Sequence, residues 1–376
     1  MITVHVAAVG DGACAAVMTA GGERPAVIID CGSQAGSREA VAGLERIVDL
    51  SRSPSTTLVV THLHRDHFNG FLSLTSIPGR RHAFGTVNLV QARLPYRPTV
   101  APFTTRYLAL QLYLGEASSI QDLDFASSIR RASRGNLMRD PKSAGETFVA
   151  SGHTFEVLWP PPEPTRSLSA RVRRAVDVFD GLADGDPKLR EALDRVIQGG
   201  LVPVDESDWG TRPEGPKVDE PEPDAEAFGS DDGSDPVSLH GLTVNSSRRR
   251  SSPGLTAGVA EAALLFRDVA NDMSLVFATP RRDFVAWGDL PAARARRIAE
   301  AEVRAVATQP KARRSIALAP DHGSHGPTPL VGDAQLCVSQ HGRGLYGKWH
   351  GRRGDTPESC ISTYEEGDIF IREHLY

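Results

Sequence analysis

Residues 61–67 read Thr-His-Leu-His-Arg-Asp-His, which places three histidines and one aspartate within six positions, directly after an apolar segment. Alternate side chains of an extended segment point the same way, so His62 and His64 can aim both imidazoles at one point. Asp66 and His67 are adjacent and can serve a second centre. Neutral imidazole and carboxylate groups suit Zn²⁺, Mn²⁺ or Fe²⁺. Because such groups are costly to bury without a metal or full hydrogen bonding, the pattern predicts a metal site rather than a histidine-rich surface turn.

Hydrophobic patterning on both sides of this run predicts a chain of mixed α and β structure. Apolar runs and alternating patterns predict strands, and helical spacing of apolar residues predicts helices. The expected strands are 1–9, 15–19, 25–30, 56–61, 152–159, 273–279, 283–287, 315–319, 335–339 and 368–372, and the expected helices are 37–51, 168–196 and 291–307. Residues 10–12, Gly-Asp-Gly, form the expected turn between the first two strands.

The middle of the chain differs in composition from the two ends. Residues 166–257 begin with the charged helical segment and continue into 203–236, which is rich in Asp, Glu, Pro and Gly with few large apolar residues. Such a composition cannot bury enough surface to offset chain entropy, so we predict a mobile loop there. Arg248–Arg250 follows, and we interpret it as a solvated patch in preference to a nucleic-acid contact.

Composition excludes some classes of protein. The net charge of −5 gives no overall basic field of the kind that marks many nucleic-acid-binding proteins. No segment reaches the roughly 18 consecutive apolar residues of a membrane span. Residues 1–20 lack a basic leader, so we do not interpret them as a signal peptide. The four cysteines form no CxxC pair, which favours reduced thiols in a cytoplasmic protein. We expect no membrane partner.

The run 62–67 resembles the HxHxDH signature of the metallo-β-lactamase superfamily, and residues 27–32, Val-Ile-Ile-Asp-Cys-Gly, look like its strand ending in Asp-x-Gly. The resemblance implies an α/β fold, a four-layered αββα sandwich with metals held at one edge of two sheets. Residues 1–165 and 258–376 would be the two halves of that domain, with 166–257 inserted. One or two divalent ions are expected, Zn²⁺ in the first place and Mn²⁺ as the alternative.

A second set of passages resembles the branch that includes the hydrolase domain of DNA-uptake competence channels. Residues 271–276, Asn-Asp-Met-Ser-Leu-Val, and 286–290, Ala-Trp-Gly-Asp-Leu, look like its N-x-x-S-L-V and G-D passages. Residues 321–324, Asp-His-Gly-Ser, are similar to its His-His-Gly-Ser. This resemblance implies that Asp289 bridges two ions and that His322 is a ligand of the second.

The chain departs from the family pattern at three places. The early turn has Ala13 where the family usually has an acid, and Asp321 replaces the first histidine of His-His-Gly-Ser. Asp321 is thus either a substituted ligand or a group that contacts one. The family's separate third histidine has no clear match. His153, in Ser-Gly-His-Thr, is a candidate, although a structural histidine in a hairpin is the preferred interpretation.

These observations predict a hydrolase that uses water activated by the metal. His62 and His64 would hold the first ion, and Asp66, His67 and His322 the second. Asp66 would also orient the water or accept its proton. His325 and His341 are candidate acids for the leaving group, and for each of them contact with a metal ligand or a surface position is the alternative.

Three functions remain open for such a centre. Phosphodiester hydrolysis, with a nucleic acid or nucleotide as substrate, follows from the branch resemblance and from the arginine groups 248–250, 313–314 and 352–353. Hydrolysis of a small ester, lactone or amide is the second. A catalytically weak metal-binding partner subunit is the third, because of the missing third histidine. The acidic segment 203–236 is expected to lie away from the site or to act as an autoinhibitory flap.

Overall fold

The computed structural model describes residues 2–19, 24–50, 55–76, 84–93, 97–117, 119–199, 256–306, 315–323, 335–346 and 360–372. The acidic segment 203–236, the three arginine groups noted above and His325 lie outside these ranges. Within the described residues, no helix combines the length and the apolar character needed to cross a membrane.

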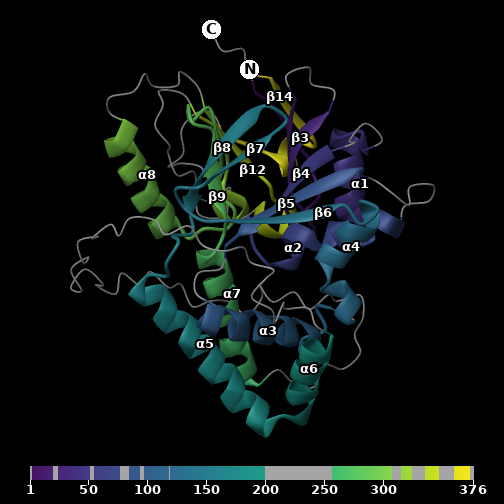
Figure 1. The fold of residues 1–376 in the computed structure, drawn as a ribbon, viewed down its shortest axis with the longest axis vertical. Helices are drawn as coiled ribbons and strands as arrows, with labels where there is room; N and C mark the ends of the chain where they lie inside the picture. The colour runs from purple at the N-terminus through teal and green to yellow at the C-terminus, as the bar shows by residue number, and fades with distance from the viewer. Residues whose placement is uncertain are drawn as a thin grey trace.

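Two seven-stranded sheets face each other (Figure 1). The first has the order β14-β1-β2-β3-β4-β5-β6 and consists of β1 (Thr3–Val6), β2 (Cys14–Met18), β3 (Pro25–Cys31), β4 (Ser55–Val60), β5 (Thr86–Ala92), β6 (Leu137–Lys142) and β14 (Ile369–Arg372). The second has the order β13-β12-β11-β10-β9-β8-β7 and consists of β7 (Thr147–Ala150), β8 (His153–Trp159), β9 (Val276–Ala278), β10 (Phe284–Ala286), β11 (Ser315–Leu318), β12 (Gln335–Ser339) and β13 (Cys360–Ser362). In each sheet three neighbouring pairs are antiparallel and three are parallel.

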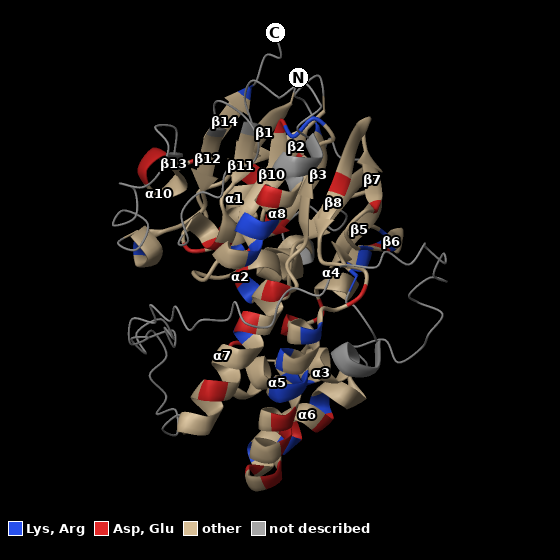
Figure 2. Ribbon diagram, turned by 90° about the vertical axis from the view of Figure 1, so that its left-hand side faces the viewer, with Lys and Arg blue, Asp and Glu red and all other residues tan. Residues whose placement is uncertain are grey.

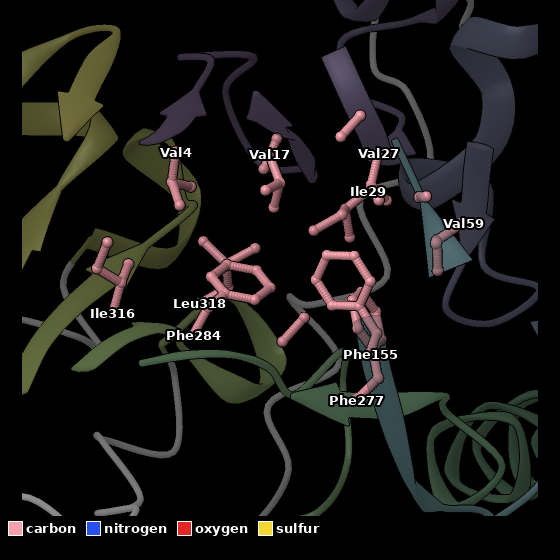
Figure 3. Packing of buried hydrophobic residues seen from close by; sticks show 14 of the residues in the cluster. Val4, Val17, Val27, Ile29, Val59, Phe155, Phe277, Phe284, Ile316 and Leu318 are labelled. Atoms are coloured by element: carbon pink, nitrogen blue, oxygen red, sulfur yellow. The ribbon is translucent and has the colours of Figure 1, made fainter. Parts of the chain in front are cut away.

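The main core lies between the two sheets. Alternate residues of a strand point to opposite faces, so Val27 and Ile29 of β3 face the second sheet while Ile28 faces the outer helices. Figure 3 shows Val27 and Ile29 pointing toward Phe155 and Phe277 of the second sheet. Burial of each such side chain contributes roughly 1.5–3 kcal/mol, so this layer holds the two sheets together.

Helices cover the outer faces of both sheets and give the four-layered αββα arrangement that was predicted. On the first sheet lie α1 (Ser37–Ile47), α2 (Arg65–Phe68), η2 (Asn69–Ser76) and α4 (Phe125–Ala132). On the second lies α8 (Ala292–Val306), which packs Ala295 and Ala299 beside Trp287. The described residues also form the short elements η3 (Ile120–Asp122), η8 (Pro320–Gly323) and α10 (Thr363–Glu366).

Four helices form a separate group at one end of the sandwich (Figure 1): α3 (Arg97–Tyr113), α5 (Arg166–Gly185), α6 (Pro187–Gln198) and α7 (Ala257–Asp272). They share their own apolar core. At its centre the ring of Phe266 stacks on Phe103 at 4.8 Å and on Tyr107 at 6.0 Å between centroids. We call α3, α5, α6 and α7 the helical group. The predicted insertion supplies α5 and α6, whereas α3 and α7 come from the segments before and after it.

The single helix expected at 168–196 is two helices. Asp186 ends α5 and caps α6, because its carboxylate accepts the backbone N–H groups of Lys188 and Leu189. Pro187 is favoured in the first turn that follows. Figure 2 shows basic and acidic residues interspersed along α5 and α6, as expected for solvated faces.

Replacing the central ring of the helical group should destabilise it strongly. Phe266 is fully buried, so Phe266→Ala should lower the free energy of unfolding by about 3–5 kcal/mol. Phe370→Ala is the matched control, because Phe370 is 56% exposed and should cost less than about 1 kcal/mol. Urea denaturation followed by circular dichroism measures both. Equal losses in the two variants would contradict the assignment of Phe266 to a packed core.

Candidate metal centre

The predicted ligands meet where strands from both sheets end. His62–His67 follows β4 in the first sheet, and Asp289 and His322 follow β10 and β11 in the second. Since β10 and β11 are parallel, their carboxyl ends lie at the same edge. The five histidine and aspartate residues other than Asp66 are at most 8% exposed, and Asp66 is partly exposed.

Asp289 lies among the histidines. Its Oδ2 is 3.5 Å from His62 Nε2, and its Oδ1 is 3.3 Å from His67 Nε2. Its Oδ2 is also 3.9 Å from His64 Nδ1 and 3.7 Å from His322 Nε2. Potential ligand atoms of His62, His67 and Asp289 therefore fall within 4.8 Å of one another.

A second group shares His67 with the first. Potential ligand atoms of Asp66, His67 and His322 also lie within 4.8 Å of one another. His67 Nε2 is 3.2 Å from His322 Nε2, and His322 Nε2 is 3.6 Å from Asp66 Oδ2. The two groups thus contain five of the six residues that were predicted to hold metal, and His64 lies beside them with its Nδ1 3.9 Å from Asp289 Oδ2.

Asp30, at the end of β3, orients the imidazole ring of His67 through its Nδ1. Its Oδ1 accepts the backbone N–H of Thr61, and its Oδ2 accepts the Thr61 hydroxyl, each at 2.8 Å. The same Oδ2 is 2.8 Å from His67 Nδ1. A carboxylate accepts, so Nδ1 of His67 donates and Nε2 is directed to the centre. Asp30 has a φ of 53°, an uncommon left-handed conformation for a residue other than glycine.

His322 is held in a similar way from the second sheet. Its Nδ1 donates to the carbonyl of Gln340 at 3.0 Å, which leaves Nε2 facing Asp66 and Asp289. Asp321 and His322 have φ values of 46° and 55°, two consecutive left-handed residues. The Asp321 N–H donates to the Gly288 carbonyl at 3.0 Å and ties this turn to the segment that carries Asp289. Left-handed backbone of this kind often occurs at functional sites.

The electrostatics of the cluster keep its carboxylates ionised. Burial alone would raise the pKa of Asp66, but the hydrogen bond from His322 and the charge of His67 lower it well below its usual range. Burial would also raise the pKa of Asp289, but the charges of His67 and His322 outweigh burial and lower it. Burial lowers the pKa of His322, yet Asp289 and Asp66 outweigh it and raise the value to about 9.

The four histidines of the centre divide into two classes by the direction in which their pKa is shifted. Burial lowers the pKa of His62 well below its ordinary value, with the charges of His67 and His64 adding to the effect. Burial also lowers the pKa of His64. At His67, burial is outweighed by Asp289 and Asp30, so its pKa is raised. His62 and His64 are therefore neutral imidazoles, the form that binds a metal.

The donor set fits a divalent cation. Nε2 of His64 is buried without a hydrogen-bond partner among the described residues. Nε2 atoms of His67 and His322 face each other at 3.2 Å, an arrangement in which a shared cation would satisfy both lone pairs. Imidazole nitrogens and carboxylate oxygens in this combination are typical ligands of Zn²⁺, and Mn²⁺ accepts the same atoms.

The other candidates from the sequence lie elsewhere or have other partners. His153 pairs with Ala150 in the β7–β8 hairpin and lines a cavity with Asp283, which precedes β10. Asp289 follows β10, so His153 lies at the opposite end of the second sheet, as the preferred hairpin interpretation requires. His341 lies with Nε2 3.1 Å from the Ser362 hydroxyl. Asp321 belongs to neither potential ligand group among the described residues.

The early turn acts on the centre through its backbone. The N–H of Ala13 donates to the Asp66 carbonyl at 3.0 Å. The carboxylate of Asp11 accepts the N–H groups of Gly342 at 2.8 Å and Gly344 at 3.1 Å. The absence of an acid at position 13 therefore leaves a turn that still positions Asp66.

The helical group borders the centre, which the sequence did not predict. Gln111 of α3 donates to the Leu63 carbonyl at 3.2 Å, between the first two histidines. The ring of Tyr107 lies 6.0 Å from that of His64 between centroids. The sequence did not predict Asp30, Gln111 or Tyr107 as part of the site. Only Asp30 had a recognisable sequence signal, because it ends an apolar strand.

Comparison with known proteins supports the expected family for the first part of the chain. Residues 9–165, less than half of the chain, match the family model of the metallo-beta-lactamase superfamily. The match includes the histidine run and ends before Asp289 and His322. A search of curated proteins found no significant match. The likeness to the competence-channel branch stays a prediction.

Removing the carboxylate that orients His67 should weaken metal binding. Asn is well tolerated in left-handed backbone, so Asp30→Asn keeps the local conformation. If its amide oxygen accepts the Thr61 N–H, its NH2 group takes the place of Oδ2 and cannot accept the hydrogen bond from His67 Nδ1. We expect affinity for Zn²⁺ to fall about 10- to 100-fold. Competition with a fluorescent chelator measures the change, and Asp283→Asn at the far end of β10 is the control. Unchanged affinity in Asp30→Asn would remove Asp30 from the centre.

Adding one methyl group at Gly32 should displace two ligands. A Cβ there would lie 2.2 Å from the Asp66 carbonyl carbon and 2.4 Å from the His67 nitrogen, so the backbone of both must move. Gly32→Ala should therefore lower the bound metal per chain. Gly181→Ala, on an exposed position of α5 with open space around its Cβ, should keep the metal and stabilise the helix by about 0.5–1 kcal/mol. Elemental analysis measures the metal bound per chain in both variants. Full metal content in Gly32→Ala would show that the close approach of Gly32 to Asp66 and His67 does not affect metal binding.

Proposed function

We propose that this protein is a metal-dependent hydrolase that cleaves phosphodiesters, in a nucleic acid or a nucleotide. One observation carries the proposal: Asp289 and His322, from the second sheet, lie within 4 Å of ligand atoms from the run 62–67 of the first sheet. The match of residues 9–165 to the metallo-beta-lactamase superfamily supports the same chemistry.

The six residues divide between two cation positions. His62 and His64 would hold one ion, Asp66, His67 and His322 the other, and Asp289 both. A divalent cation, which we propose to be Zn²⁺ with Mn²⁺ as the alternative, would supply a Lewis acid that lowers the pKa of water and stabilises negative charge on the substrate. Because His67 belongs to both potential ligand groups, its orientation by Asp30 matters for the whole centre.

Asp66 is the residue best placed to handle a proton. Its carboxylate is kept ionised by His322 and His67, so it can accept a hydrogen bond from the attacking water and orient it. Its side chain is 17% exposed, and Gln34 Nε2 donates to its Oδ2 at 3.2 Å. The carboxylate of Asp66 therefore reaches solvent on the side of Gln34.

Phosphodiesters are preferred over neutral esters for two reasons. The passages around Asp289 and His322 resemble the competence-channel branch, whose hydrolase domain belongs to DNA uptake. Non-bridging phosphate oxygens are also hard anionic donors that match a divalent cation. We propose a cytoplasmic location, because Cys14 and Cys31 are free and buried, as suits a reducing compartment.

Loss of a proposed ligand should remove metal and activity together. We expect His64→Ala and Asp289→Ala each to lower bound metal and to reduce hydrolysis of bis-p-nitrophenyl phosphate by more than about 100-fold. His153→Ala, at the other end of the second sheet, should leave both unchanged. Elemental analysis and turnover of the diester, of single- and double-stranded DNA and of a neutral ester provide the measurements.

The outcomes distinguish the three functions. Turnover of the ester without turnover of any diester would replace the proposal with a small-molecule hydrolase. Bound metal with no turnover of any substrate would favour a metal-binding partner subunit. Full metal content in both ligand variants would overturn the assignment of the centre itself.

A further inference from the structure

The segment that links α7 to β9 is hydrogen-bonded to both sides of the candidate centre. The N–H of Leu275 donates to the carbonyl of Thr61 at 2.8 Å, and Thr61 directly precedes His62. The hydroxyl of the neighbouring Ser274 accepts the backbone N–H of Asp289 at 3.2 Å. Two adjacent residues therefore connect the histidine run of the first sheet to a proposed ligand of the second sheet.

Close packing leaves little freedom at this connection. Ser274 is fully buried, and Asp289 is 3% exposed. Gly288 lies against both neighbouring segments, because a Cβ on it would be 3.1 Å from the Cβ atoms of Ser274 and Thr61. Its φ of 54° is a left-handed conformation that glycine adopts without strain. The chain that enters Asp289 is thus confined by Thr61 of the first sheet and by Ser274.

Asp272, two residues before Ser274, fixes the start of the same segment. Its carboxylate is 1% exposed and pairs with Arg171 of α5 and with Arg294 of α8, whose Nε donates to Oδ1 at 2.6 Å. Its carbonyl accepts the indole N–H of Trp159, in β8, at 2.7 Å. Charge-assisted hydrogen bonds of this kind add geometric specificity. Asp272 is therefore held by three separate elements, which gives Ser274 a fixed point from which to act.

We propose that Ser274 is a positioning residue, whose hydroxyl sets the place of Asp289 relative to the histidine run and so determines how tightly the centre binds its cations. The inference rests on the proposed function. Asp30 accepts the Thr61 N–H, and the Thr61 carbonyl accepts the Leu275 N–H. Ser274, covalently next to Leu275, then accepts the Asp289 N–H. This path joins the carboxylate that orients one proposed ligand to the backbone of another.

The position of Asp289 matters because its carboxylate lies among ligand atoms of the other sheet. Its Oδ2 is 3.5 Å from His62 Nε2, and its Oδ1 is 3.3 Å from His67 Nε2. Without the Ser274 hydroxyl, a buried N–H loses this acceptor, and the chain at Asp289 is no longer held at its present place. Metal ligands must lie within roughly 0.2 Å of their ideal distances, so a small shift of Asp289 is enough to weaken binding.

The test compares the full-length wild type with Ser274→Ala and Ser128→Ala. Ser128 of α4 is the matched control: it is a buried serine whose hydroxyl accepts a hydrogen bond, from Arg131 at 2.8 Å, and it has no contact with a proposed ligand among the described residues. Competition with a fluorescent chelator measures Zn²⁺ affinity. The visible absorption spectrum of the Co²⁺-loaded protein reports the geometry of the ligands. Urea denaturation of the metal-free proteins measures what each hydroxyl contributes to the fold alone.

We expect Ser274→Ala to bind Zn²⁺ about 10- to 100-fold more weakly than wild type and to alter the Co²⁺ spectrum. Ser128→Ala should match wild type in both measurements. The urea midpoints of the two metal-free variants should fall by similar amounts, because each variant loses a buried hydroxyl. Hydrolysis of bis-p-nitrophenyl phosphate should decrease in Ser274→Ala and not in Ser128→Ala.

Two results would overturn the inference. Ser274→Ala could match Ser128→Ala in Zn²⁺ affinity and in the Co²⁺ spectrum. Metal-free Ser274→Ala could also be unfolded under conditions where metal-free Ser128→Ala is folded, which would indicate a purely structural role. The proposed function fails separately: if wild type binds Zn²⁺ but cleaves no diester, the substrate assignment is wrong, and Zn²⁺ affinity and the Co²⁺ spectrum still decide the role of Ser274.

Discussion

The carboxylate of Asp30 is the constraint on which the candidate centre depends. One side chain accepts the Thr61 N–H, the Thr61 hydroxyl and the proton of His67 Nδ1. It thereby joins the ends of β3 and β4 and fixes the tautomer of a histidine that belongs to both potential ligand groups. The left-handed backbone at Asp30 is tolerated because these three hydrogen bonds over-determine its position.

Much of the fold could be predicted from the sequence. Residues 25–30 and 56–61 are apolar runs bounded by turns, and they are strands β3 and β4. The hairpin expected at 273–287 is confirmed as β9 and β10. Helix α3 could not be predicted, because Pro102 lies inside it and argues against a helix. The helical group also joins segments from both sides of the predicted insertion, and such packing leaves no local pattern.

The residues of the candidate site also divide into those that could be predicted from the sequence and those that could not. His62–His67 could be predicted because its members are close in sequence and their chemistry is unusual. Asp289 and His322 were found only through family resemblance, since no spacing connects residues more than two hundred positions apart. Tyr107 and Gln111 of α3 could not be found from the sequence, because only the packing of the helical group brings them beside the histidine run. The register of the β7–β8 hairpin, which separates His153 from the centre, is likewise a tertiary property.

The split of the ligands between the two sheets has a consequence for synthesis of the chain. A ribosome releases the histidine run early, and Asp289 and His322 emerge only after most of the remaining polypeptide. The first sheet itself stays incomplete until β14 arrives to pair with β1. The nascent protein therefore carries the histidine run without Asp289 and His322 through much of translation, and the proposed cation site would be complete only when the two halves dock.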